Sequence, residues 1–285
     1  MKVLVFGQSG QVGRALQASQ AQVAIQSLSR AEADFEDPEH CARHVLKTDA
    51  DAIIIAAAYT QVDQAEKEEP KALMINAQTP GAIARAAAER DLPVVHISTD
   101  YVFDGQGHAP YATDHPVAPL GAYGRTKQAG EAMVRASGAT HAVLRTSWVF
   151  SQYGNNFVKT MLRLGAERDA INVVADQLGG PTPASSIADA CINVARQLID
   201  DKRQSGTYHF SGEPDVSWAD FARAIFARAG MSCAVNDIAT ADYPTAVRRP
   251  LNSRLDNRAT LDTFGIARPN WAHALDAVLD ARDGT

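Results

Sequence analysis

KVLVFGQSGQVG, residues 2–13, is the stretch that decides the fold. An apolar run of strand length ends at Gly7, and Gly7, Gly10 and Gly13 then follow in the spacing GxxGxxG as a helical pattern begins. Gly7 would permit a tight turn, Gly10 would let a pyrophosphate approach the backbone, and Gly13 would let the helix lie close to the strand. We predict a dinucleotide-binding βα turn, with a merely tight turn as the alternative.

Apolar runs of strand length alternate with helical patterns after this turn. The predicted strands are Lys2–Phe6, Val23–Leu28, Ala52–Ala57, Pro93–Ile97 and Ala142–Thr146. The predicted helices between them are Gln11–Ser19, Pro38–Leu46, Pro70–Arg90 and Tyr123–Ser137. Such alternation is typical of parallel strands joined by crossover helices. The predicted fold is therefore α/β, a Rossmann-type doubly wound parallel sheet.

The end of the second predicted strand indicates which dinucleotide would bind. Sites that prefer NAD usually have an acidic residue there, which binds the 2′-hydroxyl of the adenosine ribose. This strand is followed by Ser29 and Arg30, whose hydroxyl and guanidinium suit a 2′-phosphate that a carboxylate would repel. We predict NADPH as the cofactor, with NADH as the alternative if Arg30 is an ordinary solvated residue.

Beyond about residue 150 the elements become shorter and turn residues more frequent. Helices are expected at Asn156–Arg168, Ser186–Asp200, Ser217–Ala229 and Trp271–Ala281. We predict an NADP(H)-binding Rossmann domain over residues 1–150, to which a segment near 181–205 returns. Residues 151–285 would form a smaller, mainly substrate-binding region.

Composition and charge exclude several classes of protein. The formal net charge of −6 comes from interleaved acidic and basic residues, so nucleic acid is not an expected partner. Cys41, Cys191 and Cys233 lack a CxxC or zinc-ligand spacing and are expected to be core residues in a reducing compartment. The apolar run before Gly7 is too short for a signal-peptide core, and no run approaches the ~18 apolar residues of a membrane span. We expect a cytoplasmic protein with no membrane partner.

Tyr123 and Lys127 are four residues apart in a predicted helix and therefore share one face of it. Reduction of a ketone needs a proton for the carbonyl oxygen, and a phenol with a pKa near 10 donates it better when a nearby ammonium lowers that pKa. Thr99 ends the preceding strand, on the side of the sheet where a cofactor would lie. We predict that Thr99 aligns the carbonyl, Tyr123 protonates it and Lys127 tunes Tyr123. A surface Tyr-Lys pair and a turn cap at Thr99 are the alternatives.

These residues, with several longer strings, resemble the extended short-chain dehydrogenase/reductase family. The strings run through most of the chain and are FGQSGQVG, AAAYTQVDQAE, STDYVFDG, YGRTKQAGE, LRTSWVF, GNNFVKTMLRL, DQLGGPT and RRPLNSRL. The resemblance implies an NAD(P)H-dependent oxidoreductase acting on a nucleotide sugar. More narrowly, it implies reduction of the 4-keto group of dTDP-4-dehydro-6-deoxy-L-mannose to dTDP-L-rhamnose, the last step in making this donor for cell-surface polysaccharides.

The resemblance also implies roles for individual residues. Trp148, Thr99 and Asp100 would contact the substrate. For Trp148, the alternative is a plain core tryptophan. Asn156 and Arg249 are weaker candidates for the diphosphate or the sugar, with a helix cap or a solvated residue as the alternative for either. The cofactor would be held by Tyr123 and Lys127 and by residues of the first, second and third βα turns: Gly7, Gly10, Gln11, Val12, Gly13, Ser29, Arg30, Asp34, Phe35, Ala58, Tyr59 and Thr60.

The residue pair after Thr99 separates reduction from related chemistry. Nucleotide-sugar 4,6-dehydratases resemble this chain but have an Asp-Glu pair there, because elimination of water needs a general acid and base. This chain has Asp100 and Tyr101, which favours simple reduction. An epimerase or dehydratase of the same fold, and a non-catalytic cofactor-binding subunit, are the alternatives.

The resemblance also implies that some members of the family form dimers. In these, glutamate side chains hold a magnesium ion that bridges the two subunits. The corresponding positions here are Ala15, Ser185 and approximately Ala281, none of which offers the oxygen ligands that magnesium prefers. We therefore expect no metal site, and a monomer or weak homodimer.

Overall fold

A six-stranded parallel sheet forms the centre of the computed structural model, which describes residues 1–283 and the side chains of residues 1–280. The strands lie across the sheet in the order β2 (Ala24–Leu28), β1 (Lys2–Phe6), β3 (Ala52–Ile55), β4 (Val94–Thr99), β5 (His141–Thr146) and β10 (Gly206–His209). Neighbouring strands pair in parallel throughout. The five predicted strands are all present, with small differences at their ends.

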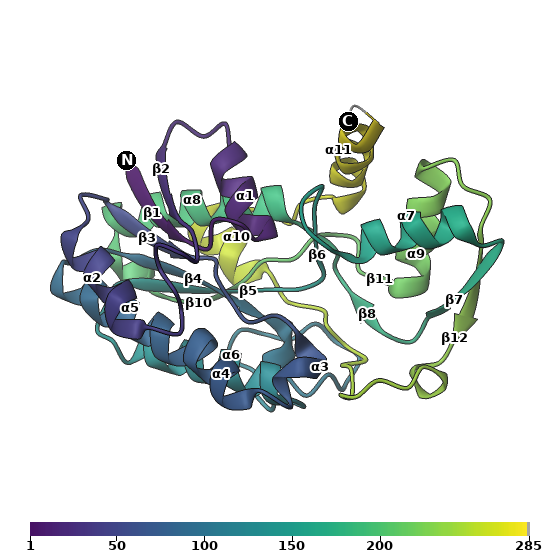
Figure 1. Cartoon of the computed structure of the whole chain (residues 1–285), viewed down its shortest axis with the longest axis horizontal. Helices are drawn as coiled ribbons and strands as arrows, with labels where there is room; N and C mark the ends of the chain where they lie inside the picture. Colours follow the sequence, from purple (N-terminus) through teal and green to yellow (C-terminus); the bar gives the residue numbers. More distant parts are fainter. Residues whose placement is uncertain (284–285) are drawn as a thin grey trace.

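Helices cover both faces of this sheet (Figure 1). One face carries α1 (Gln11–Ala18), α8 (Ala184–Asp200) and α10 (Arg258–Phe264). The opposite face carries α2 (Pro38–Lys47), α5 (Thr79–Glu89) and α6 (Ala122–Arg135). The predicted doubly wound α/β fold is therefore confirmed.

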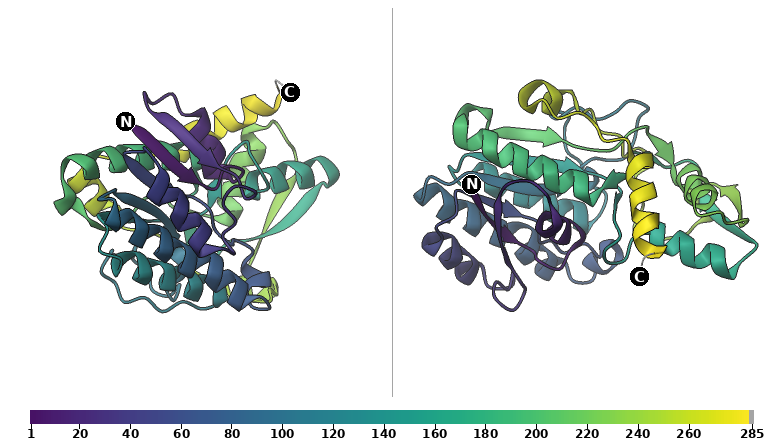
Figure 2. Two further views of the ribbon diagram at one scale, coloured as in Figure 1. Left: turned by 60° about the vertical axis from the view of Figure 1, so that its left-hand side comes forward. Right: turned by 90° about the horizontal axis from the view of Figure 1, so that it is seen from above.

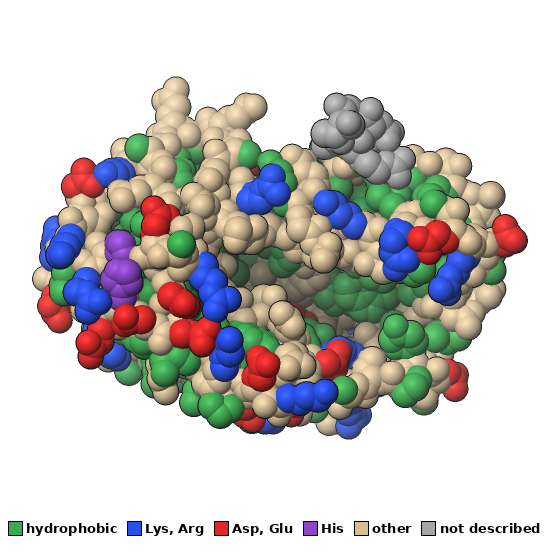
Figure 3. Space-filling view, in the orientation of Figure 1, with side chains coloured by type: hydrophobic (Ala, Val, Ile, Leu, Met, Phe, Trp, Pro, Cys, Tyr) green, Lys and Arg blue, Asp and Glu red, His purple; other side chains and the backbone are tan. Residues whose placement is uncertain are grey.

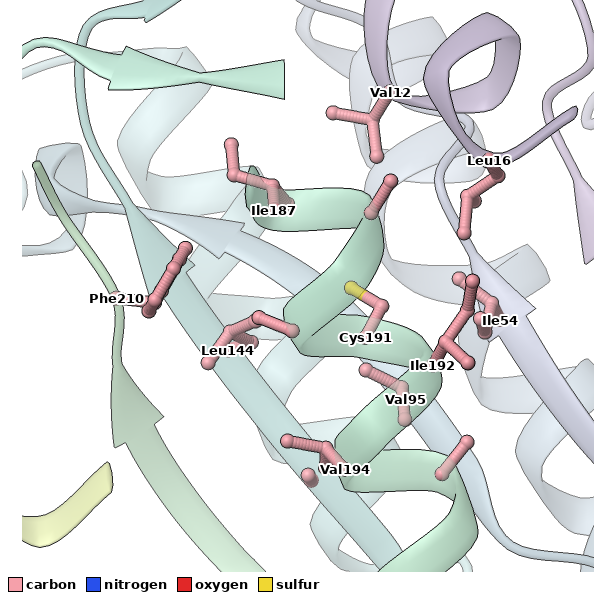
Figure 4. Packing of buried hydrophobic residues seen from close by; sticks show 14 of the residues in the cluster. Val12, Leu16, Ile54, Val95, Leu144, Ile187, Cys191, Ile192, Val194 and Phe210 are labelled. Atoms are coloured by element: carbon pink, nitrogen blue, oxygen red, sulfur yellow. The ribbon is translucent and has the colours of Figure 1, made fainter. Parts of the chain in front are cut away.

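Alternate side chains of the strands build two separate cores, because successive residues of a strand point to opposite faces. Val3 and Val5 of β1 belong to the core beneath α8, whereas Leu4 and Phe6 belong to the core beside α2 and α5. Figure 4 shows the first core, where α8 lies over Val95 of β4. Burial on both faces explains the nearly continuous apolar strands of the sequence.

One predicted helix, Pro70–Arg90, is interrupted in the structure. It divides into α4 (Glu69–Leu73), a π-helical turn η1 (Met74–Gln78) and α5. Pro80 explains the interruption, because it has no N–H to donate to the carbonyl of Asn76 and its ring would crowd that carbonyl in a regular helix. The widened turn places Asn76 against Gly130 of α6, where a Cβ would lie 2.0 Å from the Asn76 carbonyl oxygen.

The second half of the chain adds a smaller set of elements beside the sheet, on the right in Figure 1. They have their own core, formed mainly by α7 (Phe157–Glu167), α9 (Trp218–Arg228) and α11 (Trp271–Asp283), close to the predicted helices. Their short strands are β6 (Val149–Phe150), β7 (Ala170–Val174), β8 (Leu178–Gly179), β9 (Thr182–Pro183), β11 (Val216–Ser217) and β12 (Ala234–Ile238). The remaining short helices are α3 (Val62–Ala65), η2 (Asp100–Val102), η3 (Lys202–Gln204) and η4 (Thr240–Asp242).

Between β9 and β11 the chain returns to the central sheet and forms α8 and β10. Figure 2 shows α8 lying along the sheet when the molecule is seen from above. β10, the sixth strand, was not predicted. The predicted division into residues 1–150 and 151–285 stays a prediction. Within residues 1–283 no helix is both long enough and apolar enough to cross a membrane.

Candidate active site

A cavity of about 880 Å³ lies along the carboxyl ends of β1, β3, β4 and β5. It includes the point between β1 and β3 where the strand order reverses, which is where open α/β sheets bind ligands. Figure 3 shows the hollow in this face of the molecule. Most residues predicted for the site line it: Gly7, Gly10, Gln11, Val12, Ser29, Arg30, Asp34, Phe35, Ala58, Tyr59, Thr60, Thr99, Asp100, Tyr123, Lys127 and Trp148. Gly13, Asn156 and Arg249 are not among its lining residues.

The glycine turn has the geometry that the spacing predicts. Gly7 has a φ of +108°, and a Cβ there would lie 2.6 Å from the backbone nitrogen of Ala57. A Cβ at Gly13 would lie 1.8 Å from the carbonyl oxygen of Gly7, so only glycine allows α1 to start this close to β1. Gly10 precedes α1 and faces open space, with no atom within 4 Å of an added Cβ. This open cradle at a helix N-terminus suits a pyrophosphate.

The residues after β2 are already engaged with carboxylates, of which the sequence interpretation named only Asp34. The Ser29 hydroxyl donates to Glu32 at 2.6 Å. Arg30, whose side chain is 70% exposed, pairs with Glu36 at 2.6 Å and lies 3.7 Å from Asp34. A 2′-phosphate would have to draw Arg30 away from these partners, whereas a ribose 2′-hydroxyl suits a carboxylate. Glu32 and Glu36 follow the end of β2 by several residues, and their positions in the sequence did not indicate that they would reach Ser29 or Arg30.

The loop after β3 is held by a residue that sequence reasoning missed. Asn76, in the π-helical turn, accepts a hydrogen bond from the backbone N–H of Tyr59 at 2.8 Å and donates to the Tyr59 carbonyl at 3.1 Å. It also donates to the Thr126 hydroxyl of α6 at 3.1 Å. Asn76 is 1% exposed. Its two hydrogen bonds to the backbone of Tyr59 fix the predicted cofactor-contacting segment Ala58–Thr60.

Three side chains predicted to act on the substrate meet in the cavity. Tyr123 and Lys127 project from the first turns of α6, and Thr99 ends β4. The Lys127 ammonium, 2% exposed, donates to the Ile97 carbonyl at 2.7 Å. Thr99 also caps the turn η2, because its hydroxyl accepts from the Tyr101 N–H at 3.2 Å. The catalytic and the capping interpretations of Thr99 therefore both fit its position.

The acidities of this set differ from the prediction. Burial raises the pKa of Tyr123 to about 12, the Thr99 hydroxyl beside it opposes the shift, and the Asp100 charge adds to it. Burial lowers the pKa of Lys127 to about 8, and the Glu131 charge opposes that shift. Desolvation dominates, so the pKa of Tyr123 lies above its usual value, and the tuning of Tyr123 by Lys127 stays a prediction. At neutral pH Tyr123 is a protonated phenol, which is the form that donates a proton.

Asp100 and Tyr101 lie beside the predicted catalytic set, Thr99, Tyr123 and Lys127, and complete the wall around it. Asp100 is 4% exposed and accepts a hydrogen bond from Thr99 at 3.0 Å, and burial raises the pKa of Asp100 to about 6. The ring of Tyr101 lies edge-to-face against Tyr123, with centroids 5.4 Å apart. The position that carries a glutamate in dehydratases is thus filled by an aromatic ring that supports Tyr123.

The structure accounts for Asn156 and Arg249 in other ways. Asn156 caps α7, accepting from the Lys159 N–H at 3.2 Å, and its amide donates to the Gln11 side chain at 3.0 Å. Arg249 pairs with Asp63 of α3 at 2.5 Å. Asn156 is thus a helix cap, whereas Arg249 is a largely buried member of an ion pair rather than a solvated residue. Substrate contact at either residue stays a prediction.

The positions at which the family resemblance suggests magnesium ligands lie away from this cavity. Ala15 of α1 and Ser185 of α8 line a separate hollow of about 570 Å³, which contains none of the catalytic set. The side chain of Ala281 lies outside the described residues. Among the described side chains there is no group of three His, Cys, Asp or Glu that suits a metal ion.

A glycine turn and a Tyr-x-x-x-Lys helix that share one cavity at the switch point of a parallel sheet define a short-chain dehydrogenase/reductase. The family model described as "RmlD substrate binding domain" matches residues 1–283, and the chain belongs to this family. A curated relative named dTDP-4-dehydrorhamnose reductase, from Sinorhizobium fredii, is 43% identical over 278 residues, which cover 95% of this chain and 94% of the relative.

The fold of this chain is also similar to solved structures of proteins with the same name as this relative. A dTDP-4-dehydrorhamnose reductase from Clostridium acetobutylicum is 34% identical, with a TM-score of 0.92 and coverage of 99% of this chain and 100% of that one. The Bacillus anthracis dTDP-4-dehydrorhamnose reductase in complex with NADP is 36% identical, with a TM-score of 0.90 and coverage of 98% and 99%.

Proposed function

We propose that this protein is an NADPH-dependent oxidoreductase that reduces the 4-keto group of dTDP-4-dehydro-6-deoxy-L-mannose to give dTDP-L-rhamnose. The observation that carries the proposal is the meeting of Thr99, Tyr123 and Lys127 with the glycine turn in one cavity. The substrate class follows from family membership and from relatives named dTDP-4-dehydrorhamnose reductase. The cofactor follows from the NADP complex of a relative and from the open cradle at Gly10.

The residues of the cavity divide the chemistry between them. The bound dinucleotide supplies the hydride that the C4 carbon receives. Tyr123 donates its phenolic proton to the C4 oxygen as negative charge develops there, so that the carbonyl becomes a secondary alcohol. Thr99, whose single O–H donates to Asp100 in the structure, would redirect this hydrogen bond to the same oxygen and orient it. Lys127, mostly protonated at neutral pH, stabilises the phenolate that remains until solvent returns the proton.

The direct test is oxidation of NADPH by the purified protein in the presence of the keto sugar nucleotide, followed at the absorbance band of reduced nicotinamide. A reductase consumes one cofactor per sugar. An epimerase or dehydratase of this fold retains its NAD and shows no net consumption, and a non-catalytic subunit shows no turnover. Tyr101 at the dehydratase glutamate position favours the first outcome.

We further propose a cytoplasmic location and a monomer or weak homodimer. Cys41, Cys191 and Cys233 are all buried free thiols, which fits a reducing compartment. The nucleotide sugar and the dinucleotide are the proposed partners, without nucleic acid or membrane.

Arg30→Asp is expected to raise the KM for NADPH by about tenfold or more while leaving the KM for NADH nearly unchanged. The change would place a further carboxylate beside Glu32, Asp34 and Glu36, and all of these repel a 2′-phosphate. Arg43→Asp on α2 is a matched control, because it makes the same charge change outside the cavity. Equal effects of Arg30→Asp on both cofactors would refute the assignment of Arg30 to the 2′-phosphate.

Turnover is expected to persist after dialysis against EDTA, because Ala15 and Ser185 supply no carboxylate. The measurement compares kcat and the sedimentation coefficient before and after chelation. A loss of turnover that magnesium restores would contradict this expectation.

A further inference from the structure

Trp148 has a backbone conformation that bulky residues rarely adopt. It lies between β5 and β6, separated from the end of β5 by Ser147, and its φ is +49°. Among residues 1–283 only one other non-glycine residue, Asp91, has a positive φ. Such a conformation persists where the surroundings impose it, and it is concentrated at ligand sites. The Trp148 carbonyl accepts from the Thr182 N–H at 3.1 Å, which helps to hold the strained residue while its indole lines the cavity.

Two residues that do not line the cavity confine this indole. The ring of Trp218 is stacked on it, with centroids 3.6 Å apart and planes 11° from parallel. Gly179 meets its edge, where a Cβ would lie 2.6 Å from Cε2 and 3.0 Å from Nε1 of Trp148. Any side chain at residue 179 would therefore displace the indole, because these contacts are far below van der Waals distance.

The pairing of two short strands brings the confining residues together. β8 and β11 are antiparallel, with Gly179 opposite Val216 and Leu178 opposite Ser217. Ser217 then caps α9 by accepting from the Asp220 N–H at 3.0 Å, so Trp218 begins the helix immediately beside β8. The slot for the Trp148 indole is therefore built by the second half of the chain, whereas Trp148 itself follows a strand of the central sheet.

We propose that Gly179 and Trp218 are specificity-determining positions that fix the Trp148 indole and thereby set how tightly the keto sugar nucleotide is held. This inference rests on the proposed function, since it assumes that Trp148 contacts that substrate. Gly179 and Trp218 act through the indole and lie outside the catalytic set, so they affect substrate binding more than the chemical step. A misplacement of a positioning group by about 1 Å is enough to change catalysis by up to about 100-fold.

Gly179→Ala is the sharpest test, because Gly179 has no positive φ and its replacement adds only the clash with the indole. The KM for the keto sugar nucleotide is expected to rise about tenfold, with kcat at saturation and the KM for NADPH within about twofold of wild type. Gly206→Ala on β10 is the matched control. It is also a glycine in a strand, but the atoms nearest to its added Cβ would belong to the Tyr208 side chain, at 3.3–3.5 Å. It should leave all three constants unchanged.

Trp218 provides an independent arm. Trp218→Ala removes the stacking partner and should raise the same KM, whereas Trp218→Phe keeps a flat ring and should restore most of it. Wild type that fails to oxidise NADPH with the keto sugar would overturn the proposed function. Wild type that is active, with an unchanged KM in Gly179→Ala, would overturn only this inference. A parallel fall of kcat and of thermal stability, with no separate rise in that KM, would also overturn it.

Discussion

Replacing Tyr123 by Phe is expected to lower kcat for the keto sugar by about 100- to 10,000-fold, because the reaction loses its proton donor. The ring itself stays, so its edge-to-face contact with Tyr101 at 5.4 Å and the packing around it are retained. The KM values for both substrates should therefore change little. Tyr243→Phe, at a tyrosine that is 56% exposed and outside the cavity, is the control and should retain wild-type kcat.

The dependence of kcat on pH is expected to show whether Lys127 assists Tyr123 in the reaction. The pKa of Tyr123 is raised to about 12, so the phenol stays protonated throughout the neutral range. The pKa of Lys127 is lowered to about 8, so its ammonium is present below that pH and is lost as the pH rises through it. The kcat of reduction should be flat between a pH of about 6, where Asp100 titrates, and about 8, and should fall above a pH of about 8. An alkaline fall that survives in Lys127→Met would show that another group titrates.

Glu131→Ala is expected to destabilise the protein by about 3–5 kcal/mol, the cost typical of breaking a buried ion pair. Glu131 is fully buried on α6, and Arg145 of β5, 3% exposed, donates to both of its oxygens at 2.8 and 2.7 Å. Ser98 of β4 donates a third hydrogen bond at 2.7 Å. Burial would raise the pKa of Glu131, but the hydrogen bonds and charge of Arg145 outweigh burial and hold that pKa below its usual range.

The measurement is the free energy of unfolding in urea. Glu167→Ala is the matched control, because Glu167 pairs with Arg163 on a helix at 3.0 Å with both side chains more than half exposed. Its loss should be about 1 kcal/mol or less. The double variant Glu131→Leu/Arg145→Met should regain much of the stability, since most of the cost comes from leaving the Arg145 charge buried without its carboxylate. Equal losses in Glu131→Ala and Glu167→Ala would argue against a buried network.

The features that the sequence predicted are those written in local patterns. The five apolar strands and the GxxGxxG turn depend on neighbouring residues, and Tyr123 and Lys127 share a face because of helical periodicity. Strand β10, Gly206–His209, was not predicted because its sequence Gly-Thr-Tyr-His is not a continuous apolar run and its place depends on pairing with β5. The pKa values of Tyr123 and Lys127 were not predicted for a related reason. Desolvation depends on the whole surrounding fold, which residue spacing does not reveal.

The carboxylates around Arg30 illustrate a different limit. Their types and positions were visible, but which of them reaches Arg30 depends on the path of the loop between β2 and α2. In the structure Glu36 rather than Asp34 forms the close pair. The preference for NADPH therefore depends on a competition between a phosphate and a carboxylate for one guanidinium, which the identity of Arg30 alone does not reveal.

The return of the chain to the sheet as α8 and β10 limits how this protein can be cut or recombined. A fragment ending near residue 150 would retain five strands but would lack α8, so Val3, Val5 and Val95 would lose the helix that covers them. Exposed apolar sheet of this kind promotes aggregation. Exchange of the substrate-contacting elements between relatives therefore requires several junctions, on both sides of α8 and β10, and a single crossover would separate the sheet from its own cover.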